Sequence, residues 1–263
     1  MKWIMIAITA LLLSAPQAWA STVQQKHSEM LYTVVTVESR ALGSGTVVYS
    51  KKFKGNYETF ILTNHHVVSS AIDINKEWDP IKKKKVDVEK LETVKIRWFD
   101  YNNLSRSVGT RGKIADIVAY DKRKDLALLK IRDKERGVKN VAIMRHPCRT
   151  INLFDNVYAV GSGLGKPPFA TKGVLSLLDE EINGHRYMLA TAPIIYGNSG
   201  GALFRLDIEN NKYEFIGIPS RVESSYFQTV THMGFSIPMQ TVWQFLKKNK
   251  FKRILSAGCG KDK

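Results

Sequence analysis

The alternation of apolar and polar side chains along the chain predicts many short β-strands. In residues 93–101, TVKIRWFDY, the apolar residues Val94, Ile96 and Trp98 are separated by single residues, which is the pattern of a strand with one buried face. Similar runs, rich in Val, Ile, Thr and aromatic residues, recur with turn residues between them. We predict strands within residues 31–39, 43–50, 57–64, 93–101, 113–121, 126–132, 156–163, 171–178, 186–193, 201–207, 213–220 and 231–238. Short strands in this number and spacing are typical of all-β barrels or sandwiches.

Two stretches differ from this pattern. Residues 238–251, PMQTVWQFLKKNKF, place Pro238 near the start and Val242, Phe245 and Leu246 on one side, which predicts a helix. Residues 69–92 are polar and contain four consecutive lysines at 82–85. We interpret this stretch as a solvated surface loop. Its lysine-rich part, residues 76–90, is also a candidate contact for an acidic partner.

The first twenty residues have the features of a secretory signal peptide. The apolar run 3–13 follows Lys2, and Ala18-Trp19-Ala20 fits a cleavage site. Because the apolar run is too short to cross a bilayer comfortably, we favour a cleaved signal peptide, residues 1–20, over an uncleaved anchor. We therefore expect an exported protein, periplasmic or extracellular, with one folded domain over residues 21–255 and a basic tail, residues 256–263.

The charge balance of the chain indicates which classes of partner it would bind. The 263-residue chain has 40 Lys+Arg against 24 Asp+Glu and a formal net charge of +16, which favours anionic partners. We do not expect nucleic acid to be the partner, because the chain has no nucleic-acid-binding motif. The cysteines, Cys148 and Cys259, would pair or stay free in an exported protein, and the sequence leaves both possibilities open.

Candidate chemistry is concentrated around Ser199, in the segment Gly-Asn-Ser-Gly-Gly, residues 197–201. A serine hydroxyl attacks a carbonyl only with a base, a group that orients the base, and donors for the oxyanion that forms. Glycine at 197 permits a turn in which its N–H and that of Ser199 face one small cavity. We expect the oxyanion hole to be formed by Gly197, Asn198 and Ser199. The alternative is a glycine-rich hairpin with an incidental serine.

A base and a carboxylate are available elsewhere in the chain. His65 and His66 follow the predicted strand that ends at Thr63-Asn64, and a histidine at a strand end is a candidate general base. We discount a metal site, because no cysteine or carboxylate lies near them at zinc-ligand spacing. Asp125 begins the apolar run 126–129, where a carboxylate costs free energy unless it is paired. An imidazole N–H is a natural partner for it.

The order His, Asp, Ser in a strand-rich chain is that of chymotrypsin-type double barrels. The sequence resembles the trypsin-like serine peptidases, and among them the HtrA type. The matching segments are GSGTVV (43–48), LTNHHVV (62–68), DLALLKI (125–131), GNSGGAL (197–203), FIGI (215–218) and GFSIP (234–238). The resemblance covers about residues 30–246. It implies two packed six-stranded antiparallel β-barrels, over residues 30–135 and 136–237, followed by the helix 238–251.

The resemblance also assigns site residues. Its Thr-Asn-x-His-Val motif makes His66, rather than His65, the catalytic histidine, with Asp125 as the carboxylate and Ser199 as the nucleophile. It implies that an extended substrate pairs with residues 217–221, and that the specificity pocket is lined by Pro193, Tyr196, Ile218, Pro219, Ser220, Arg221 and Gly234. With Pro193 at the expected floor, we predict a preference for apolar or small side chains. Arg221 leaves an acidic preference open.

The function implied is that of an exported serine endopeptidase which acts on proteins or peptides through an acyl-enzyme and needs no cofactor. HtrA proteins usually carry PDZ domains after the protease domain, and since this chain ends about where they would begin, we do not expect PDZ-type recruitment. The sequence leaves the oligomeric state open. The alternative is a catalytically silent relative that binds protein or an anionic surface, for which the net charge of +16 is the main argument.

Overall fold

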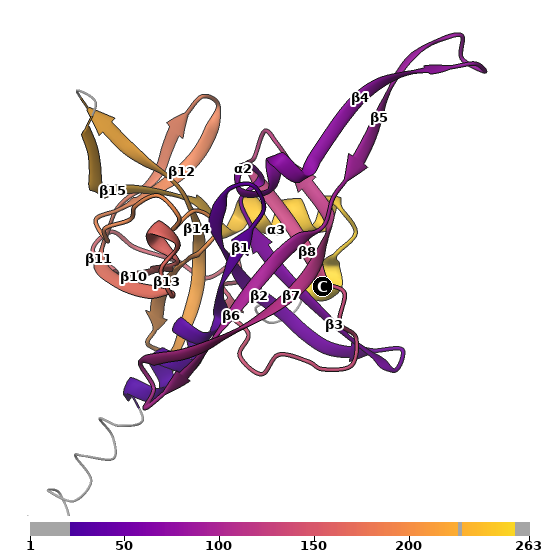
Figure 1. Ribbon diagram of the computed structural model, residues 1–263. Coiled ribbons are helices and arrows are strands. Elements are labelled where there is room, and N and C mark those ends of the chain that lie inside the picture. The colour runs from indigo at the N-terminus through magenta and orange to yellow at the C-terminus, as the bar shows by residue number, and fades with distance from the viewer. Residues whose placement is uncertain (1–21, 226–227, 256–263) are drawn as a thin grey trace, which may run out of the picture.

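The computed structural model describes residues 22–225 and 228–255. The predicted signal peptide and the predicted basic tail lie outside the described residues. Two β-rich halves pack side by side, the first drawn from indigo to magenta and the second mainly in orange (Figure 1). None of the described helices is long and apolar enough to cross a membrane.

The first half is a closed six-stranded barrel with the strand order β1-β2-β3-β8-β7-β6, and every neighbouring pair is antiparallel. Its strands are β1 (Val34–Glu38), β2 (Leu42–Phe53), β3 (Asn56–Thr63), β6 (Val94–Asn102), β7 (Arg106–Asp121) and β8 (Leu126–Ile131). Alternate residues point inward, so Val35, Val37, Ile61, Ile96 and Leu129 form part of one buried cluster. The predicted first barrel is confirmed.

The second half is a seven-stranded sheet in the order β13-β10-β11-β12-β15-β14-β9. Its strands are β9 (Ile143–Met144), β10 (Asn156–Gly161), β11 (Phe169–Ile182), β12 (His185–Ala190), β13 (Ala202–Asp207), β14 (Lys212–Ser225) and β15 (Gln228–Pro238). Because β13 also pairs with β14, the six antiparallel strands follow one another in a ring. The short β9 pairs in parallel with β14, and it is the one strand of this sheet that the sequence pattern did not predict.

Helical segments are short. They comprise residues 22–29, η1 (Leu31–Thr33), α2 (His65–Val68), η2 (Ser69–Ala71), η3 (Gly163–Gly165), α3 (Met239–Lys248) and η4 (Lys252–Ile254). The predicted C-terminal helix is α3, which buries Val242, Phe245 and Leu246. It ends three residues before the predicted boundary, since Lys250 takes a left-handed backbone, with φ of 66°, that a helix does not continue through.

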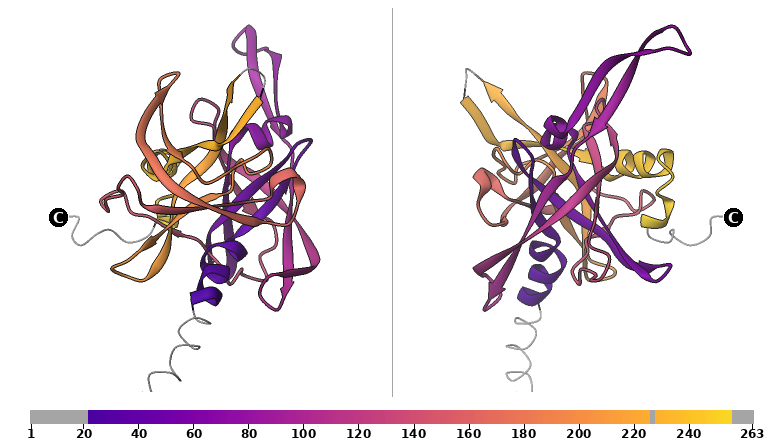
Figure 2. Two further views of the ribbon diagram at one scale, coloured as in Figure 1. Left: turned by 90° about the vertical axis from the view of Figure 1, so that its left-hand side faces the viewer. Right: turned by 45° about the vertical axis from the view of Figure 1, so that its right-hand side comes forward.

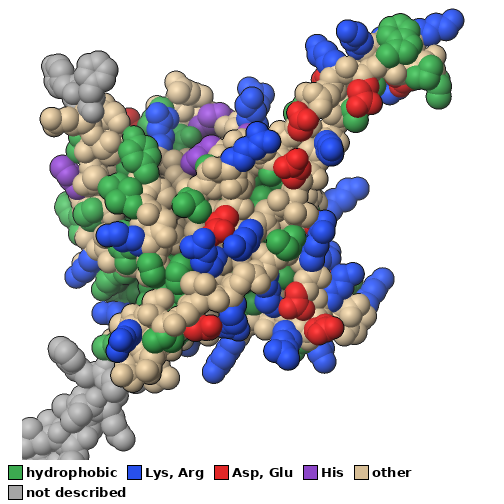
Figure 3. Space-filling model, viewed as in Figure 1, with side chains coloured by type: hydrophobic (Ala, Val, Ile, Leu, Met, Phe, Trp, Pro, Cys, Tyr) green, Lys and Arg blue, Asp and Glu red, His purple; other side chains and the backbone are tan. Residues whose placement is uncertain are grey.

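Residues 72–91 differ most from the prediction, because they form a hairpin rather than an irregular loop. β4 (Ile72–Asp79) and β5 (Lys84–Leu91) pair only with each other, and they project from the body in all views (Figures 1 and 2). Near the tip, Trp78 is 62% exposed and Ile81 is 91% exposed. The projecting hairpin carries both basic and apolar side chains on its surface (Figure 3).

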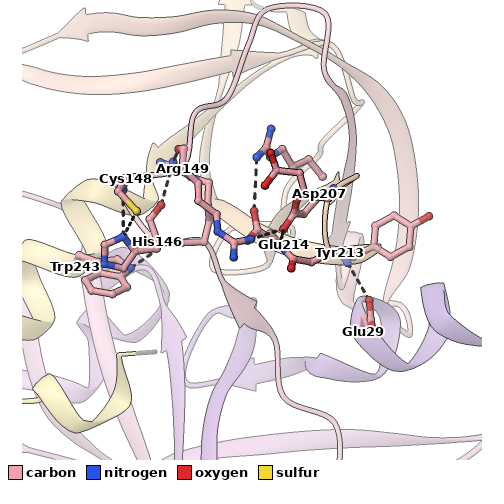
Figure 4. A network of polar contacts seen from close by, with 12 residues as sticks. Glu29, His146, Cys148, Arg149, Asp207, Tyr213, Glu214 and Trp243 are labelled. Carbon is pink, nitrogen blue, oxygen red and sulfur yellow. Dashed lines mark hydrogen bonds and ion pairs between the residues drawn. The ribbon is translucent and has the colours of Figure 1, made fainter. Parts of the chain in front are cut away.

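Cys148 is the one cysteine among the described residues, and it lies in the second half. Cys148 is disulfide-bonded, and Cys259, the only other cysteine of the chain, lies outside the described residues. Cys148 belongs to the segment that follows β9, next to His146 and the buried Trp243 of α3 (Figure 4).

Candidate active site

His66 and Asp125 lie together in the structure. His66 stands in the first turn of α2, directly after β3, and its Nδ1 is 2.9 Å from Asp125 Oδ2 and 3.0 Å from Oδ1. The backbone N–H of His66 also donates to Asp125 Oδ1 at 3.0 Å. Because the carboxylate accepts from both the ring and the backbone of one residue, it fixes the position of the imidazole and leaves Nε2 available.

The backbone of Asp125 is held in an uncommon conformation. Its φ of 52° is left-handed, which costs about 1 kcal/mol or more for a residue other than glycine. Two contacts support it: Asn64 Nδ2 donates to the Asp125 carbonyl at 2.9 Å, and Asp121 Oδ1 accepts the N–H of Lys124 at 3.0 Å. This turn ends as β8 begins, which directs the Asp125 side chain toward α2.

The pKa of the Asp125 carboxyl reflects these contacts. Burial alone raises its pKa, but the hydrogen bonds from His66 and Ser220, together with attraction to His66, bring the pKa below its usual value. The carboxylate is therefore charged through the neutral range, as a group that stabilises an imidazolium has to be.

Ser199 is connected to this pair through Ser220. The Ser220 hydroxyl donates to Asp125 Oδ2 at 2.7 Å, and the Ser199 hydroxyl donates to the Ser220 carbonyl at 3.4 Å. Among the described contacts, this weak bond is the one that the Ser199 hydroxyl makes, and it makes none to His66. Ser220 is the bulged residue of β14, since Pro219 pairs with Ser236 and Arg221 pairs with Phe235. The bulge lets both its hydroxyl and its carbonyl face the site.

The turn before Ser199 presents free donors. Gly197 has φ of 97° and Gly200 has φ of 83°, conformations that favour glycine. In the described part of the chain, the N–H groups of Gly197 and Ser199 have no hydrogen-bond acceptor. Asn198 differs from the prediction, because its N–H donates to the Ile195 carbonyl at 3.0 Å. Gly197 and Ser199 are thus the two residues of the predicted set with donors left for an anion.

Ser44 of β2 ties this turn to the first barrel, and the sequence analysis did not identify its role. Its hydroxyl donates to the Gly197 carbonyl at 2.6 Å and accepts the Ser162 N–H at 2.8 Å. Its backbone N–H donates to the Ser199 carbonyl at 2.8 Å. The one available signal was its place in the motif GSGTVV, residues 43–48.

The residues predicted to bind substrate have different environments. Pro193 is exposed, and its carbonyl accepts the Thr171 hydroxyl at 2.6 Å; its place at the floor of the specificity pocket stays a prediction. Tyr196 is 69% exposed, whereas Ile218 is fully buried. Arg221 lies over the ring of Tyr187, with 5.9 Å between the guanidinium carbon and the ring centroid.

The two remaining residues of that set are also buried. The side chains of Pro219 and of its neighbour Ile218 are packed inside, and a side chain at Gly234 would meet Ile194 at 2.8 Å. In this part of the predicted pocket the side chains are not available to a substrate, and the Pro219 carbonyl already accepts the Gly200 N–H at 3.1 Å.

One edge of β14 is open next to Ser199. β13 pairs with β14 only as far as Gly217, while β15 continues along the other side to Ser225. After Gly217, β13 no longer runs beside β14, and no other described strand pairs with β14 on that side. An extended peptide can pair with an edge of this kind.

His65 has a packing role. It is 8% exposed and lies against Tyr120, with 5.4 Å between ring centroids. Burial lowers the pKa of its imidazole, which Asp125 offsets only in part, so folding favours the neutral ring. Within residues 22–225 and 228–255, no group of three or more His, Cys, Asp or Glu side chains is arranged to hold a metal ion.

The chain is similar to a protein family, to curated proteins and to solved structures. Residues 43–218 match the trypsin-like peptidase domain family. A Pseudomonas fluorescens protein named "Probable periplasmic serine endoprotease DegP-like" is 27% identical over 226 residues, which cover 84% of this chain and 37% of that protein. The "Periplasmic serine endoprotease DegP" of Escherichia coli K12 is 28% identical over 207 residues, which cover 77% of this chain and 34% of that protein.

The chain therefore spans about a third of the length of the curated relatives it matches. Among solved structures, "HtrA-type protease AlgW with tripeptide" superimposes with a TM-score of 0.62 at 21% identity, covering 88% of this chain and 64% of that one. At that identity the likeness supports the fold.

Proposed function

The chain belongs to the trypsin-like peptidase domain family, and we propose that it is an exported serine endopeptidase with His66, Asp125 and Ser199 as its catalytic residues. The observation that carries the proposal is the Asp125 carboxylate, which accepts hydrogen bonds from the His66 ring and from the Ser220 hydroxyl, while Ser220 also contacts Ser199. The names of the periplasmic relatives and the signal-peptide pattern of residues 1–20 support export.

In the proposed mechanism, Ser199 Oγ attacks the carbonyl carbon of the scissile peptide bond while His66 Nε2 takes the hydroxyl proton. The oxyanion accepts hydrogen bonds from the backbone N–H groups of Gly197 and Ser199. His66 then gives its proton to the leaving amine as the C–N bond breaks, which leaves an acyl ester on Ser199. Water, deprotonated by His66, hydrolyses this ester and restores the hydroxyl.

One rotation precedes the chemistry. In the structure the Ser199 hydroxyl points to the Ser220 carbonyl at 3.4 Å, and attack requires that it turn about its Cα–Cβ bond toward His66 Nε2. The existing bond is long and weak, so the rotation costs little. A substrate N–H that pairs with the Ser220 carbonyl would release the hydroxyl, which is consistent with catalytic hydrogen bonds that form only in the complex.

Substrate would lie as an added strand along the open edge of β14, next to Pro219, Ser220 and Arg221. The apolar surroundings of Ile194 and Ile218 favour apolar or small side chains in the pocket. The Arg221 side chain is engaged with Tyr187, which makes it a weaker candidate for binding an acidic side chain. A panel of peptides that differ only in the residue before the cleaved bond would decide between these preferences.

The projecting hairpin is a second candidate contact. Its lysines at 76, 82–85 and 90 are exposed, with Trp78 and Ile81 among them. Carboxylates lie along both strands of the hairpin, so its positive charge is concentrated in the four consecutive lysines 82–85 at the tip. We infer that an acidic protein would bind this tip, because a local cluster of exposed charges of one sign guides association. The base of the hairpin follows α2 and η2, so a partner bound at the tip would be tethered on the same side of the first half as α2 (Figure 1).

The proposal is tested by incubating the purified mature chain with denatured proteins and identifying the new termini by mass spectrometry. We expect internal cleavage by the wild type and none by Ser199→Ala. Circular dichroism of both proteins is the folding control. A folded wild type that cleaves nothing, yet binds the same denatured proteins, would favour the catalytically silent alternative.

A further inference from the structure

The second half contains a cavity that the proposed chemistry does not use. Its volume is about 630 Å³, within the range of small-ligand sites. It lies among the segment after β9, strand β12 and the start of α3, and it is lined by residues that include Lys124, Arg145, Arg149 and Arg186. His66, Asp125 and Ser199 do not line it.

Arg145 is the unusual residue of this cavity. It is only 6% exposed, and its Nη1 donates to two backbone carbonyls, those of His146, at 3.2 Å, and Arg149. Its Nε is buried without a partner. Among the described residues, no carboxylate lies within ion-pair distance of its guanidinium. A buried cation in this state costs free energy unless an anion joins it.

The buried carboxylates of this region form ion pairs with arginines other than Arg145, although Glu214 Oε2 has no hydrogen-bond partner among the described residues. Arg149 pairs with Asp207 and, at 2.7 Å, with Glu214, and Figure 4 shows its guanidinium directed at both. Arg205 pairs with Asp155 at 2.9 Å and with Glu214 at 3.6 Å. Burial lowers the pKa of the Arg145 guanidinium, repulsion by Arg205 adds to this, and Glu214 offsets only part.

The rest of the lining is also short of negative charge. Asp179 is the one carboxylate among the described residues that line the cavity, and it pairs with Arg186 at 2.9 Å. The described contacts of Lys124 include no ion pair. They consist of the hydrogen bond that its backbone N–H donates to Asp121. Two cations, Lys124 and Arg145, thus face one cavity without counter-charges.

We propose that this cavity binds an organic anion, a carboxylate or phosphate group attached to an apolar chain. The planar guanidinium suits the paired oxygens of either head group. Ile151, Leu178, Met188 and Ile237 also line the cavity, and an apolar chain would cover them, which a bare inorganic ion would not. Since Lys124 precedes Asp125 and Tyr187 contacts Arg221, the ligand would lie behind the active site and outside the substrate strand.

The test is isothermal titration of the purified full chain with octanoate and with octyl phosphate, with neutral octanol and inorganic phosphate as matched probes. We expect one octanoate or octyl phosphate to bind per chain, at least about tenfold more tightly than octanol or inorganic phosphate, as a charge-assisted hydrogen bond and apolar burial each contribute. Carboxylate and phosphate heads are compared directly in the same series. Equal affinity for octanol, or no binding of either anion at millimolar concentration, would overturn the proposal.

Variants locate the binding. Arg145→Gln and Lys124→Gln should each weaken octanoate binding, the first by about tenfold or more. Lys139→Gln is the matched control, since Lys139 is exposed and does not line the cavity, and its affinity should stay unchanged. If Arg145→Gln fails to fold, Lys124→Gln is the decisive variant. The Lys124 side chain makes no described contact, so its replacement should leave the fold intact. Unchanged affinity in the folded variants would refute the assignment, whatever the peptidase activity proves to be.

Discussion

Gly197 is a residue at which one added carbon atom would disturb the proposed oxyanion donors. A side chain there would meet the Ser162 carbonyl at 2.7 Å and the Leu164 nitrogen at 2.9 Å. The φ of 97° is also one that L side chains rarely adopt. The backbone must therefore shift if Gly197 is replaced, and its N–H shifts with it.

We predict that Gly197→Ala lowers kcat by about 10²–10³-fold, the effect of losing one oxyanion donor, with a smaller change in KM. The control is Gly55→Ala, in the turn between β2 and β3. Gly55 has φ of 89° and nothing within 4 Å of an added carbon, so this variant shares the backbone strain and lies outside the site. Steady-state kinetics on a peptide substrate decides, and an equal loss of kcat in both variants would contradict the role of Gly197.

The lowered pKa of Asp125 predicts that the free energy of unfolding depends on pH. Its folded pKa lies below the ordinary value of about 3.9, so its contribution to the free energy of unfolding is complete above that pH. It is lost as the pH falls through the folded pKa. The difference in unfolding free energy between wild type and Asp125→Asn should therefore shrink as the pH falls below about 4. Urea unfolding from pH 7 to pH 2 measures it, and a constant difference would be the contrary result.

At the scale of elements, the sequence predicted the barrel strands and α3 but not the β4–β5 hairpin. The barrel strands bury apolar side chains, so the sequence shows either alternating apolar residues, as in β6, or continuous apolar runs, as in β8. β4 and β5 expose nearly all of their residues, and only their pairing with each other makes them strands. A pattern that depends on burial could not detect them.

We predict that the hairpin is dispensable for folding. Replacing residues 73–90 by a short Gly-Ser turn should change the melting temperature by only a few degrees, since β4 and β5 pair only with each other. Cleavage of a short peptide should persist, while binding to an acidic protein should weaken, as it should when lysines 82–85 are all changed to Gln. Differential scanning calorimetry and binding measurements decide. A large fall in melting temperature would show that the hairpin supports the barrel.

At the scale of the whole molecule, the site is assembled from both halves, and this assembly explains which site residues the sequence could supply. His66, Asp125 and Ser199 stand in recognisable motifs. The hydroxyl contacts of Ser44 and Ser220 join residues far apart in the chain, such as Ser44 with Gly197 and Ser220 with Asp125. The motif GSGTVV marks Ser44 but does not specify its partners, and the segment around Ser220 does not specify the contact with Asp125, so only the packing of the two halves reveals them.

Ser44→Ala should therefore impair stability and activity together. It leaves the buried Ser162 N–H without its acceptor, which costs about 1–3 kcal/mol, and it frees the turn that carries Gly197. Ser50→Ala is a matched control on the same strand. The Ser50 hydroxyl accepts the Val138 N–H at 2.7 Å, far from the site, so this variant should lose similar stability and keep its kcat. Equal kcat in the two variants would argue against Ser44 as a support of the oxyanion turn.

The most direct test of the account is covalent labelling of the folded mature chain with a fluorophosphonate, followed by peptide mapping. A serine activated by a histidine base reacts with this reagent, whereas ordinary serines do not. The account predicts one adduct, on Ser199, that is absent in Ser199→Ala and strongly reduced in His66→Ala. A folded wild-type chain that stays unlabelled, or an adduct at another serine, would contradict it.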